Sequence, residues 1–275
     1  MRFAISQLWR FGWTQATCCA FAVGTFAGLA LTQLIELPVP RYDALLVYLV
    51  LLTAAFRLSG LESTREIAVI GLFHLIGLAF EIVKVHMGSW NYPESAFTKV
   101  GGVPLYSGFL YAAVGSYVCM AWRRFELRLT GYRSGAALVV ALGVYANFIT
   151  HHWLPDLRIP LAVLLVLVTG RTTVHFTVGP RRYRMPLALS FLLIGFFLWV
   201  AENIATFLGA WHYPHQDDGW QLVHTSKFGA WALLVSVTFV LVAQLQARLG
   251  RLHEPEPLPG DPAPPALAPA PALVP

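Results

Sequence analysis

Two glutamates inside apolar segments are the residues of this sequence best suited to chemistry. Glu81 and Glu202 each precede a Gly, a Trp, a Tyr and a Pro in one shared register, with an offset of 121 residues. A carboxylate at membrane depth costs about 2.5–3.5 kcal/mol on insertion scales, so it is retained either for function or to hold helices together. We expect function, because a carboxyl group in an apolar site can act as a general acid or base.

The surroundings of the two glutamates predict different roles for them. His74, Glu81 and Lys84 follow a helical spacing and share one face, whereas the second segment has Gly195 and Ala205 at the positions equivalent to His74 and Lys84. A neighbouring cation favours a carboxylate, and burial without one favours the neutral acid. We therefore predict that Glu202 donates a proton and that Glu81, paired with Lys84, is the base. His74 is either a proton-relay residue or a hydrogen-bonded core histidine.

Aromatic residues follow each glutamate where the helix is expected to end. We predict that they form the rim of a substrate cavity together with one amide side chain; the residues are Trp90, Tyr92, Trp211, Tyr213 and Asn203. Trp and Tyr also gather at any membrane surface, so an ordinary aromatic belt is the alternative. Their duplication in register favours a shared cavity.

The histidines are weak candidates for a metal site. His151, His152, His212 and His215 fall in segments expected at one membrane face, but they do not have a diagnostic ligand spacing. The sequence contains no His-Glu-x-x-His helix, P-loop, dinucleotide fingerprint or Gly-x-Ser-x-Gly elbow. We therefore predict no metal and no cofactor.

The composition indicates which elements must position these residues. Of 275 residues, 57% are apolar and 12% are charged, against a usual charged share of about 25%. A membrane-crossing helix needs roughly 17–25 apolar residues. The sequence therefore predicts an all-α polytopic membrane bundle of eight helices, at residues 15–37, 42–60, 66–88, 103–123, 134–152, 157–174, 186–209 and 225–247.

The basic residues account for the net charge of +5 by their position along the chain. Fourteen fall in the segments on one side of the predicted bundle: Arg2, Arg10, Arg57, Arg65, Arg123, Arg124, Arg128, Arg133, Arg171, Arg181, Arg182, Arg184, Arg248 and Arg251. The other side has only Arg41, Lys99, Arg158 and Lys227. This bias predicts a bacterial inner-membrane protein with both termini in the cytoplasm. It also makes a nucleic-acid partner unnecessary.

The offset of 121 residues predicts an internal duplication. We expect a first four-helix repeat at residues 1–122 and a second at 123–252. Because each would have an even number of spans, the two repeats would have the same orientation in the membrane. Residues 253–275 are rich in Pro and Ala and are predicted to be a disordered tail.

Several segments resemble a known bacterial family of integral membrane proteins, the YoaT-like family, whose function is unknown. The segments are Phe73 to Gly77, Gly88 to Glu94, Pro104 to Tyr111, Thr150 to His152, Ala201 to Ile204 and Gly209 to Gln216. The resemblance spans roughly residues 20–247. It implies a polytopic inner-membrane protein and no activity. A fainter similarity, in plan only, is to membrane carotenoid cyclases and hydratases, which protonate a polyene.

Two functions from different classes fit these observations. The first is a membrane enzyme that acts on a lipid or isoprenoid by glutamate acid/base chemistry near the outer leaflet. The second is a small-molecule or proton-coupled transporter built from parallel repeats. A structural membrane subunit is a third. In the first two the expected partner is a lipid or another hydrophobic small molecule.

Overall fold

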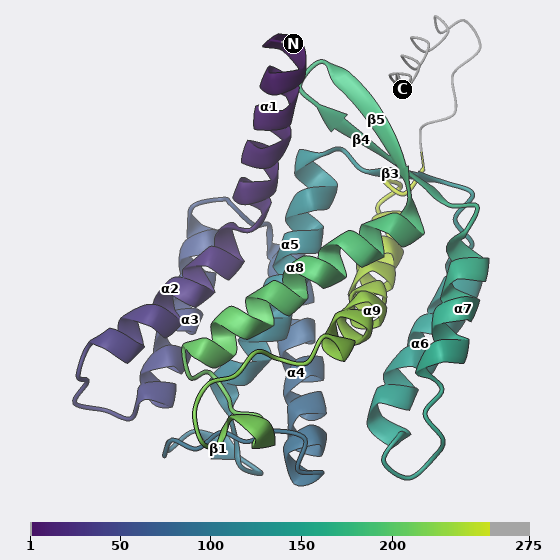
Figure 1. Ribbon diagram of the computed structural model, residues 1–275. Helices are drawn as coiled ribbons and strands as arrows, with labels where there is room; N and C mark the ends of the chain where they lie inside the picture. Colours follow the sequence, from purple (N-terminus) through teal and green to yellow (C-terminus); the bar gives the residue numbers. More distant parts are fainter. Residues whose placement is uncertain (1, 254–275) are drawn as a thin grey trace, which may run out of the picture.

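The computed structural model describes residues 2–253 and is mostly helical (Figure 1). Its α-helices are α1 (Arg2–Cys18), α2 (Ala20–Leu34), α3 (Arg41–Leu58), α4 (Thr64–His86), α5 (Gly108–Arg124), α6 (Ser134–Thr150), α7 (Arg158–Thr169), α8 (Leu187–Phe207) and α9 (Ser226–Arg248). The predicted tail, apart from His253, lies outside the described residues. Each of the eight predicted spans coincides with one of the helices α2 to α9.

Two small antiparallel sheets make the prediction of an all-α chain wrong in detail. One pairs β1 (Lys99–Val100) with β2 (Val103–Pro104). The other has the order β3-β4-β5, with β3 (Arg128–Thr130), β4 (Thr173–Val178) and β5 (Arg181–Pro186). Short 3-10 turns, η1 (Leu105–Ser107) and η2 (Pro214–Gln216), complete the described structure.

The sixth predicted span, residues 157–174, is also wrong at its C-terminal end. Helix α7 stops at Thr169, and Thr173 already belongs to β4. β-branched residues at 172–174 favour an extended chain. Gly179, with a φ of 56°, then turns the chain into β5. The sequence stretch that looked like the end of a membrane helix is therefore part of a hairpin.

The first predicted span begins before a sharp bend. Helices α1 and α2 meet at Cys19 and are bent by 60° relative to each other. Helix α1 extends beside the β4–β5 hairpin (Figure 1), where the Gln7 amide donates to the Val178 carbonyl at 3.2 Å. Helix α2 follows most of the predicted span, whereas α1 turns away from it and packs on α5 and on the hairpin.

Three helices, α4, α8 and α9, are long and apolar enough to cross a membrane, and the bent pair α1–α2 raises that number to four. Helices α6 and α7 are apolar but shorter. These helices fit a membrane protein. The eight crossings remain a prediction.

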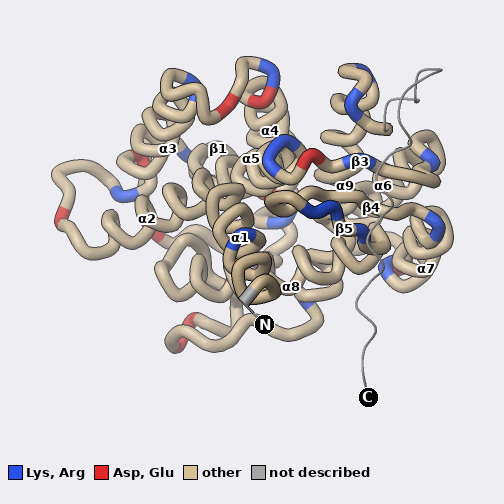
Figure 2. Tube along the Cα trace, turned by 90° about the horizontal axis from the view of Figure 1, so that it is seen from above, with Lys and Arg blue, Asp and Glu red and all other residues tan. Residues whose placement is uncertain are grey.

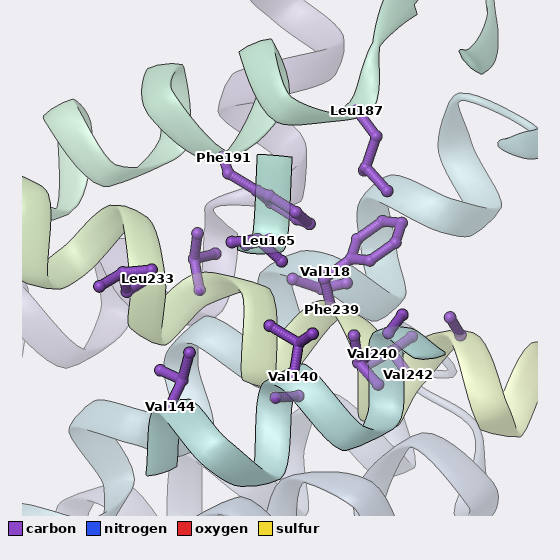
Figure 3. Packing of buried hydrophobic residues seen from close by; sticks show 14 of the residues in the cluster. Val118, Val140, Val144, Leu165, Leu187, Phe191, Leu233, Phe239, Val240 and Val242 are labelled. Atoms are coloured by element: carbon purple, nitrogen blue, oxygen red, sulfur yellow. The ribbon is translucent and has the colours of Figure 1, made fainter. Parts of the chain in front are cut away.

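The helices pack in two similar sets. Helix α4 packs on α5 as α8 packs on α9, and α2 packs on α3 and α5 as α6 packs on α7 and α9. Helices α5 and α9 pack against each other between the sets. Buried side chains from α5, α6, α7 and α8, including Val118, Val140, Leu165 and Phe191, form one core with Phe239 of α9 (Figure 3). This core lies beside α4 and α8, which carry the two glutamates.

Candidate functional site

The helices that carry the two glutamates end in the same way. Gly88 and Gly209 have φ angles of 68° and 66°, a conformation that favours glycine. After α4, the Ser89 N–H donates to the Lys84 carbonyl at 3.0 Å. After α8, the equivalent Ala210 N–H donates to the Ala205 carbonyl, also at 3.0 Å. These are Schellman caps, and each turns the chain back toward its glutamate.

The loops that follow the two caps pair with each other through their backbones. The Asn91 N–H donates to the His212 carbonyl at 2.9 Å, and the His212 N–H donates to the Asn91 carbonyl at 3.0 Å. The two residues are equivalent under the offset of 121. The ring of Trp90 also meets that of Tyr213 edge-on, with centroids 5.9 Å apart. The two loops therefore form one structure over both helix ends.

Glu81 is buried and accepts three hydrogen bonds. Oε2 accepts from the Trp90 indole at 2.6 Å and from the Tyr92 hydroxyl at 2.7 Å. Oε1 accepts from the Tyr111 hydroxyl of α5 at 2.7 Å. Burial and the nearby Glu81 carboxyl raise the pKa of Tyr92 well above its usual value, so this phenol remains a donor.

Glu202 is also buried, but it accepts only two hydrogen bonds from side chains. Oε1 accepts from the Tyr213 hydroxyl at 2.5 Å, and Oε2 accepts from the Trp231 indole of α9 at 2.8 Å. Burial and the Glu202 carboxyl raise the pKa of Tyr213 well above its usual value. Tyr92 and Tyr213 are thus equivalent donors to equivalent glutamates.

The predicted pairing of Lys84 with Glu81 is not formed. The Lys84 ammonium lies 3.0 Å from Nε2 of His152 and 5.6 Å from the centre of the Phe80 ring. Burial, followed by the charge of Lys84, lowers the pKa of His152, which favours a neutral ring that can accept this hydrogen bond. Lys84 leans toward the loop after α6 because that loop offers an acceptor, while Glu81 already has three donors.

The cation that lies near a glutamate is instead Lys227, at the start of α9. Its ammonium lies 4.6 Å from the centre of the Tyr213 ring and 5.3 Å from that of Trp90. Tyr213 in turn donates to Glu202. The premise for the predicted division of roles is therefore wrong: this cation lies over one aromatic donor of each glutamate, and it comes from a helix that the spacing within α4 or α8 could not indicate.

A single cavity brings the two glutamates together. Its empty volume is about 800 Å³, including space open to solvent. It is lined from both helix sets, by the two glutamates, cations, aromatic rings and aliphatic side chains: Phe80, Glu81, Lys84, Ser89, Trp90, Leu110, Tyr111, Phe148, His151, Arg158, Glu202, Trp211, Tyr213, Lys227, Ala230, Trp231 and Leu234.

Three of the predicted site residues lie away from the cavity lining. Tyr92 is behind Glu81, to which it donates. Asn203 joins α8 to the loop before α9, because its Oδ1 accepts from the Val223 N–H at 2.8 Å. His74 packs on the Phe109 ring, with centroids 4.4 Å apart, and its Nδ1 is buried without a hydrogen-bond partner.

The candidate metal ligands do not form a cluster. His151 and His152 stack with ring centroids 4.3 Å apart, but His215 stacks on Tyr213 in another loop, and the His212 backbone pairs with Asn91. Within residues 2–253, no group of three or more His, Cys, Asp or Glu side chains could hold a metal ion.

Sequence reasoning missed several residues of the site. Tyr111 and Trp231 are not among the residues that the sequence predicts for the site. Both belong to helices that pack beside the glutamate helices, where no local spacing relates them to Glu81 or Glu202. Arg41 was only an outer-face charge, yet its guanidinium donates to the Leu208 carbonyl at 2.6 Å and pairs with Glu94 at 2.7 Å. The sequence offered one signal for Arg41: it follows a Pro-rich turn on the side of the predicted bundle that has few basic residues.

Comparison with known proteins finds an uncharacterized relative and solved structures of similar fold. It is 55% identical over 245 residues to the uncharacterized protein YoaT of Bacillus subtilis (strain 168), covering 88% of this chain and 93% of that protein. Its fold is similar to that of MvINS, a mycobacterial Insig homolog from Mycobacterium vanbaalenii, with a TM-score of 0.47 and 18% identity over 70% of this chain and 94% of that one. A cross-linked trimer of MvINS gives a TM-score of 0.46.

The family comparison agrees with the resemblance drawn from the sequence motifs. A family described as "Protein of unknown function (DUF817)" matches residues 7–239, a range that contains both glutamates and both aromatic loops. The chain therefore belongs to the DUF817 family of proteins of unknown function.

Proposed function

We propose that this protein is a membrane-embedded enzyme that binds a lipid or isoprenoid in the cavity and transfers protons through Glu81 and Glu202. The observation that carries the proposal is that the two glutamates, from α4 and α8, line one cavity together with aromatic and aliphatic side chains. Buried carboxyl groups beside an apolar ligand can act as general acid and base. The aliphatic and aromatic lining favours a hydrophobic substrate.

Two phenols connect the glutamates to a ligand in this scheme. Tyr111 donates to Glu81 and Tyr213 donates to Glu202, and both tyrosines line the cavity. A phenol can give its proton to a ligand and regain one from the carboxyl group behind it, whereas an indole only donates its hydrogen bond. We therefore propose Tyr111 and Tyr213 as the groups that touch the substrate.

Lipid extraction from the purified protein, followed by mass spectrometry, tests the proposal. Wild type and the variants Glu202→Gln and Glu81→Gln are compared after expression in the same cells. We expect a bound lipid or isoprenoid, and a different ratio of substrate to product in the variants, because a glutamine cannot transfer the proton. An identical set of lipids, in identical ratios, in all three proteins would contradict an enzymatic role.

A proton-coupled transporter is the second candidate, favoured by the two similar sets of helices. The same helix pairs pack within each set, and α5 meets α9 between them. Parallel repeats of this kind rock about a central site in some transporters. Proton flux that depends on an added hydrophobic substrate in proteoliposomes, lost in Glu202→Gln, would favour this function over the enzyme.

We also propose that residues 1–122 and 123–252 are tandem repeats that cross a bacterial inner membrane eight times. Figure 2 looks onto the end of the molecule that carries α1 and the β4–β5 hairpin, and it shows basic residues on both. The loops after α4 and α8 lie at the opposite end (Figure 1). The bias of basic residues supports a cytoplasmic location for the basic end.

Chemical labelling of intact cells tests this orientation. Cysteine at the exposed positions Asn91 and Asp218 should react with an impermeant maleimide. Cysteine at Arg65, in the first turn of α4, should react only after the cells are opened. The wild-type protein, with its three free cysteines, gives the background. Labelling of Arg65→Cys in intact cells, with protection of the other two, would reverse the topology.

A further inference from the structure

Three cations line the cavity, and of these only Arg158 has a carboxylate partner within residues 2–253. Arg158 pairs with Asp156 at 2.6 Å. Lys84 has the neutral acceptor Nε2 of His152, and Lys227 lies over two aromatic rings. Neither ammonium lies within 4.0 Å of a carboxylate in residues 2–253. An ammonium has three N–H donors, so both lysines have donors left to offer to the cavity.

The two glutamates on the same wall do not use up these donors. Both oxygens of each carboxylate are already bound by indoles and phenols. Lys84 is almost fully buried, with 4% of its surface exposed. A buried charge is costly without a partner, and a ligand oxygen between the lysines would supply one. The outer end of the cavity thus suits a negatively charged group.

The inner end of the cavity is apolar. A second pocket shares Phe80, Tyr111, Trp231 and Leu234 with the first and extends along α4 as far as Phe73. Its other lining residues are almost all hydrocarbon or aromatic: Ile76, Gly77, Val114, Tyr145, Leu198, Val235, Val237 and Thr238. Lys84 and Phe73 are eleven residues apart, so the lining extends about 16 Å along the helix axis. This lining suits an apolar tail.

We infer that the cavity binds an amphiphile with an anionic head group, a carboxylate or phosphate, held by Lys84, Lys227 and Arg158, and with its tail in the apolar pocket. The inference rests on the proposed function in that it names the substrate class of the same cavity. The head group lies beside the two glutamates, so the first carbons of the tail face Tyr111 and Tyr213. Carboxylate and phosphate share the required chemistry, and separate probes distinguish them.

Binding of matched probes to the protein in nanodiscs tests the inference. Dodecyl phosphate, dodecanoate and dodecanol have the same tail and differ in head group. We expect at least one anionic probe to bind about tenfold or more tightly than dodecanol, a difference of about 1.4 kcal/mol. Lys84→Met and Lys227→Met should each raise the Kd of the anionic probe about tenfold and leave that of dodecanol unchanged. Arg171→Gln, at an exposed position outside the cavity lining, should change neither.

The outcomes separate the two proposals. If dodecanol binds as tightly as both anionic probes, or if both lysine variants bind the anions normally, the anionic head group is wrong while an apolar substrate stands. If none of the three probes binds, both the anionic head group and the proposal that the cavity binds a hydrophobic ligand are wrong. A preference for dodecyl phosphate over dodecanoate, or the reverse, identifies the head group.

Discussion

The ends of α4 and α8 are built on one plan and differ in what surrounds the carboxylate. Each has a glutamate, a Schellman cap seven residues later and a tyrosine that folds back to donate to that glutamate. Glu81 has three side-chain donors and Glu202 has two, while Lys227 lies over one aromatic donor of each glutamate. The shared part is local in sequence. The differing part comes from α5 and α9, which supply a phenol and an indole, and from Trp90, because the donors found for Glu202 do not include the equivalent Trp211.

This difference indicates that the two similar segments supply the scaffold, while part of the hydrogen bonding to each glutamate comes from a partner helix. Tyr111 and Trp231 reach their glutamates from α5 and α9, at positions that are not equivalent under the offset of 121. Each partner helix therefore supplies one donor, a phenol to Glu81 and an indole to Glu202, and the third donor to Glu81 is Trp90 of its own loop. Different environments are a common means of assigning different roles to paired acids.

The largest expected effect is on the stability of the two glutamate sites. Glu81→Leu leaves three buried donors without an acceptor, and Glu202→Leu leaves two. At about 1–3 kcal/mol for each unsatisfied donor, we expect a loss of about 4 kcal/mol for Glu81→Leu and a smaller one for Glu202→Leu. Thermal unfolding in detergent measures both. Glu81→Gln is the control, because the amide oxygen still accepts from Trp90 and Tyr92. Equal losses of stability in the two Leu variants would contradict the difference between the two glutamate sites.

Arg41 acts on only one of the two helix ends. Its guanidinium donates to the Leu208 and Gly209 carbonyls after α8 and pairs with Glu94. Hydrogen bonds to a charged group contribute about 1.5–3 kcal/mol each, so Arg41→Ala should lower stability by about 3 kcal/mol. Cysteine at Ala210 should then react faster with maleimide than cysteine at the equivalent Ser89. Unchanged reactivity at both positions would mean that Arg41 does not hold the end of α8.

The segments that precede α4 and α8 differ in a way that the pH dependence of stability can reveal. Glu62, before α4, is buried and bound by the Ser116 hydroxyl, while the equivalent Tyr183 before α8 binds Gln7. Burial raises the pKa of Glu62 from 4.5 to about 6. The folded protein holds this proton more tightly than the unfolded chain does. The stability contribution is therefore complete below pH 4.5 and is lost as the pH rises through 6.

Glu62→Gln should remove this pH dependence because the amide stays neutral. Above pH 6 the variant should be more stable than wild type by about 2 kcal/mol, and near pH 4.5 the two should be similar. Melting temperatures at pH 4.5 and pH 8 measure the difference. For Tyr183→Phe, before α8, the difference in melting temperature from wild type should be the same at both pH values. A Gln variant that is less stable than wild type at pH 8 would contradict the role of burial.

The smallest expected effect concerns the two caps. Gly88→Ala and Gly209→Ala both place a side chain at a positive φ, which costs roughly 1–2 kcal/mol. A Cβ at Gly88 meets open space, whereas one at Gly209 lies 3.3 Å from Nη1 of Arg41. We expect the Gly209 variant to be the less stable by a few tenths of a kcal/mol or more. In an Arg41→Ala background the two substitutions should cost the same.

Much of the fold could be predicted because a long apolar stretch of sequence is enough to indicate a membrane helix. The eight predicted spans each contain a helix, and the caps at Gly88 and Gly209 followed from glycine at the end of an apolar run. The β4–β5 hairpin could not be separated from span six, since a short apolar β-branched stretch fits a strand or the end of a helix. The bend at Cys19 has no proline or glycine at that position to indicate it.

By itself, the sequence determined the family, the membrane character and the two carboxylates with their tyrosines, because each depends on composition or on residues about one loop apart. Only the tertiary structure decided which donors and cations surround each carboxylate. Lys84 is one helical turn from Glu81 in sequence but is bound to His152, and Lys227 reaches the site from a helix that starts 24 residues after Glu202. A side chain goes where an acceptor and space are available, and packing between distant helices creates both.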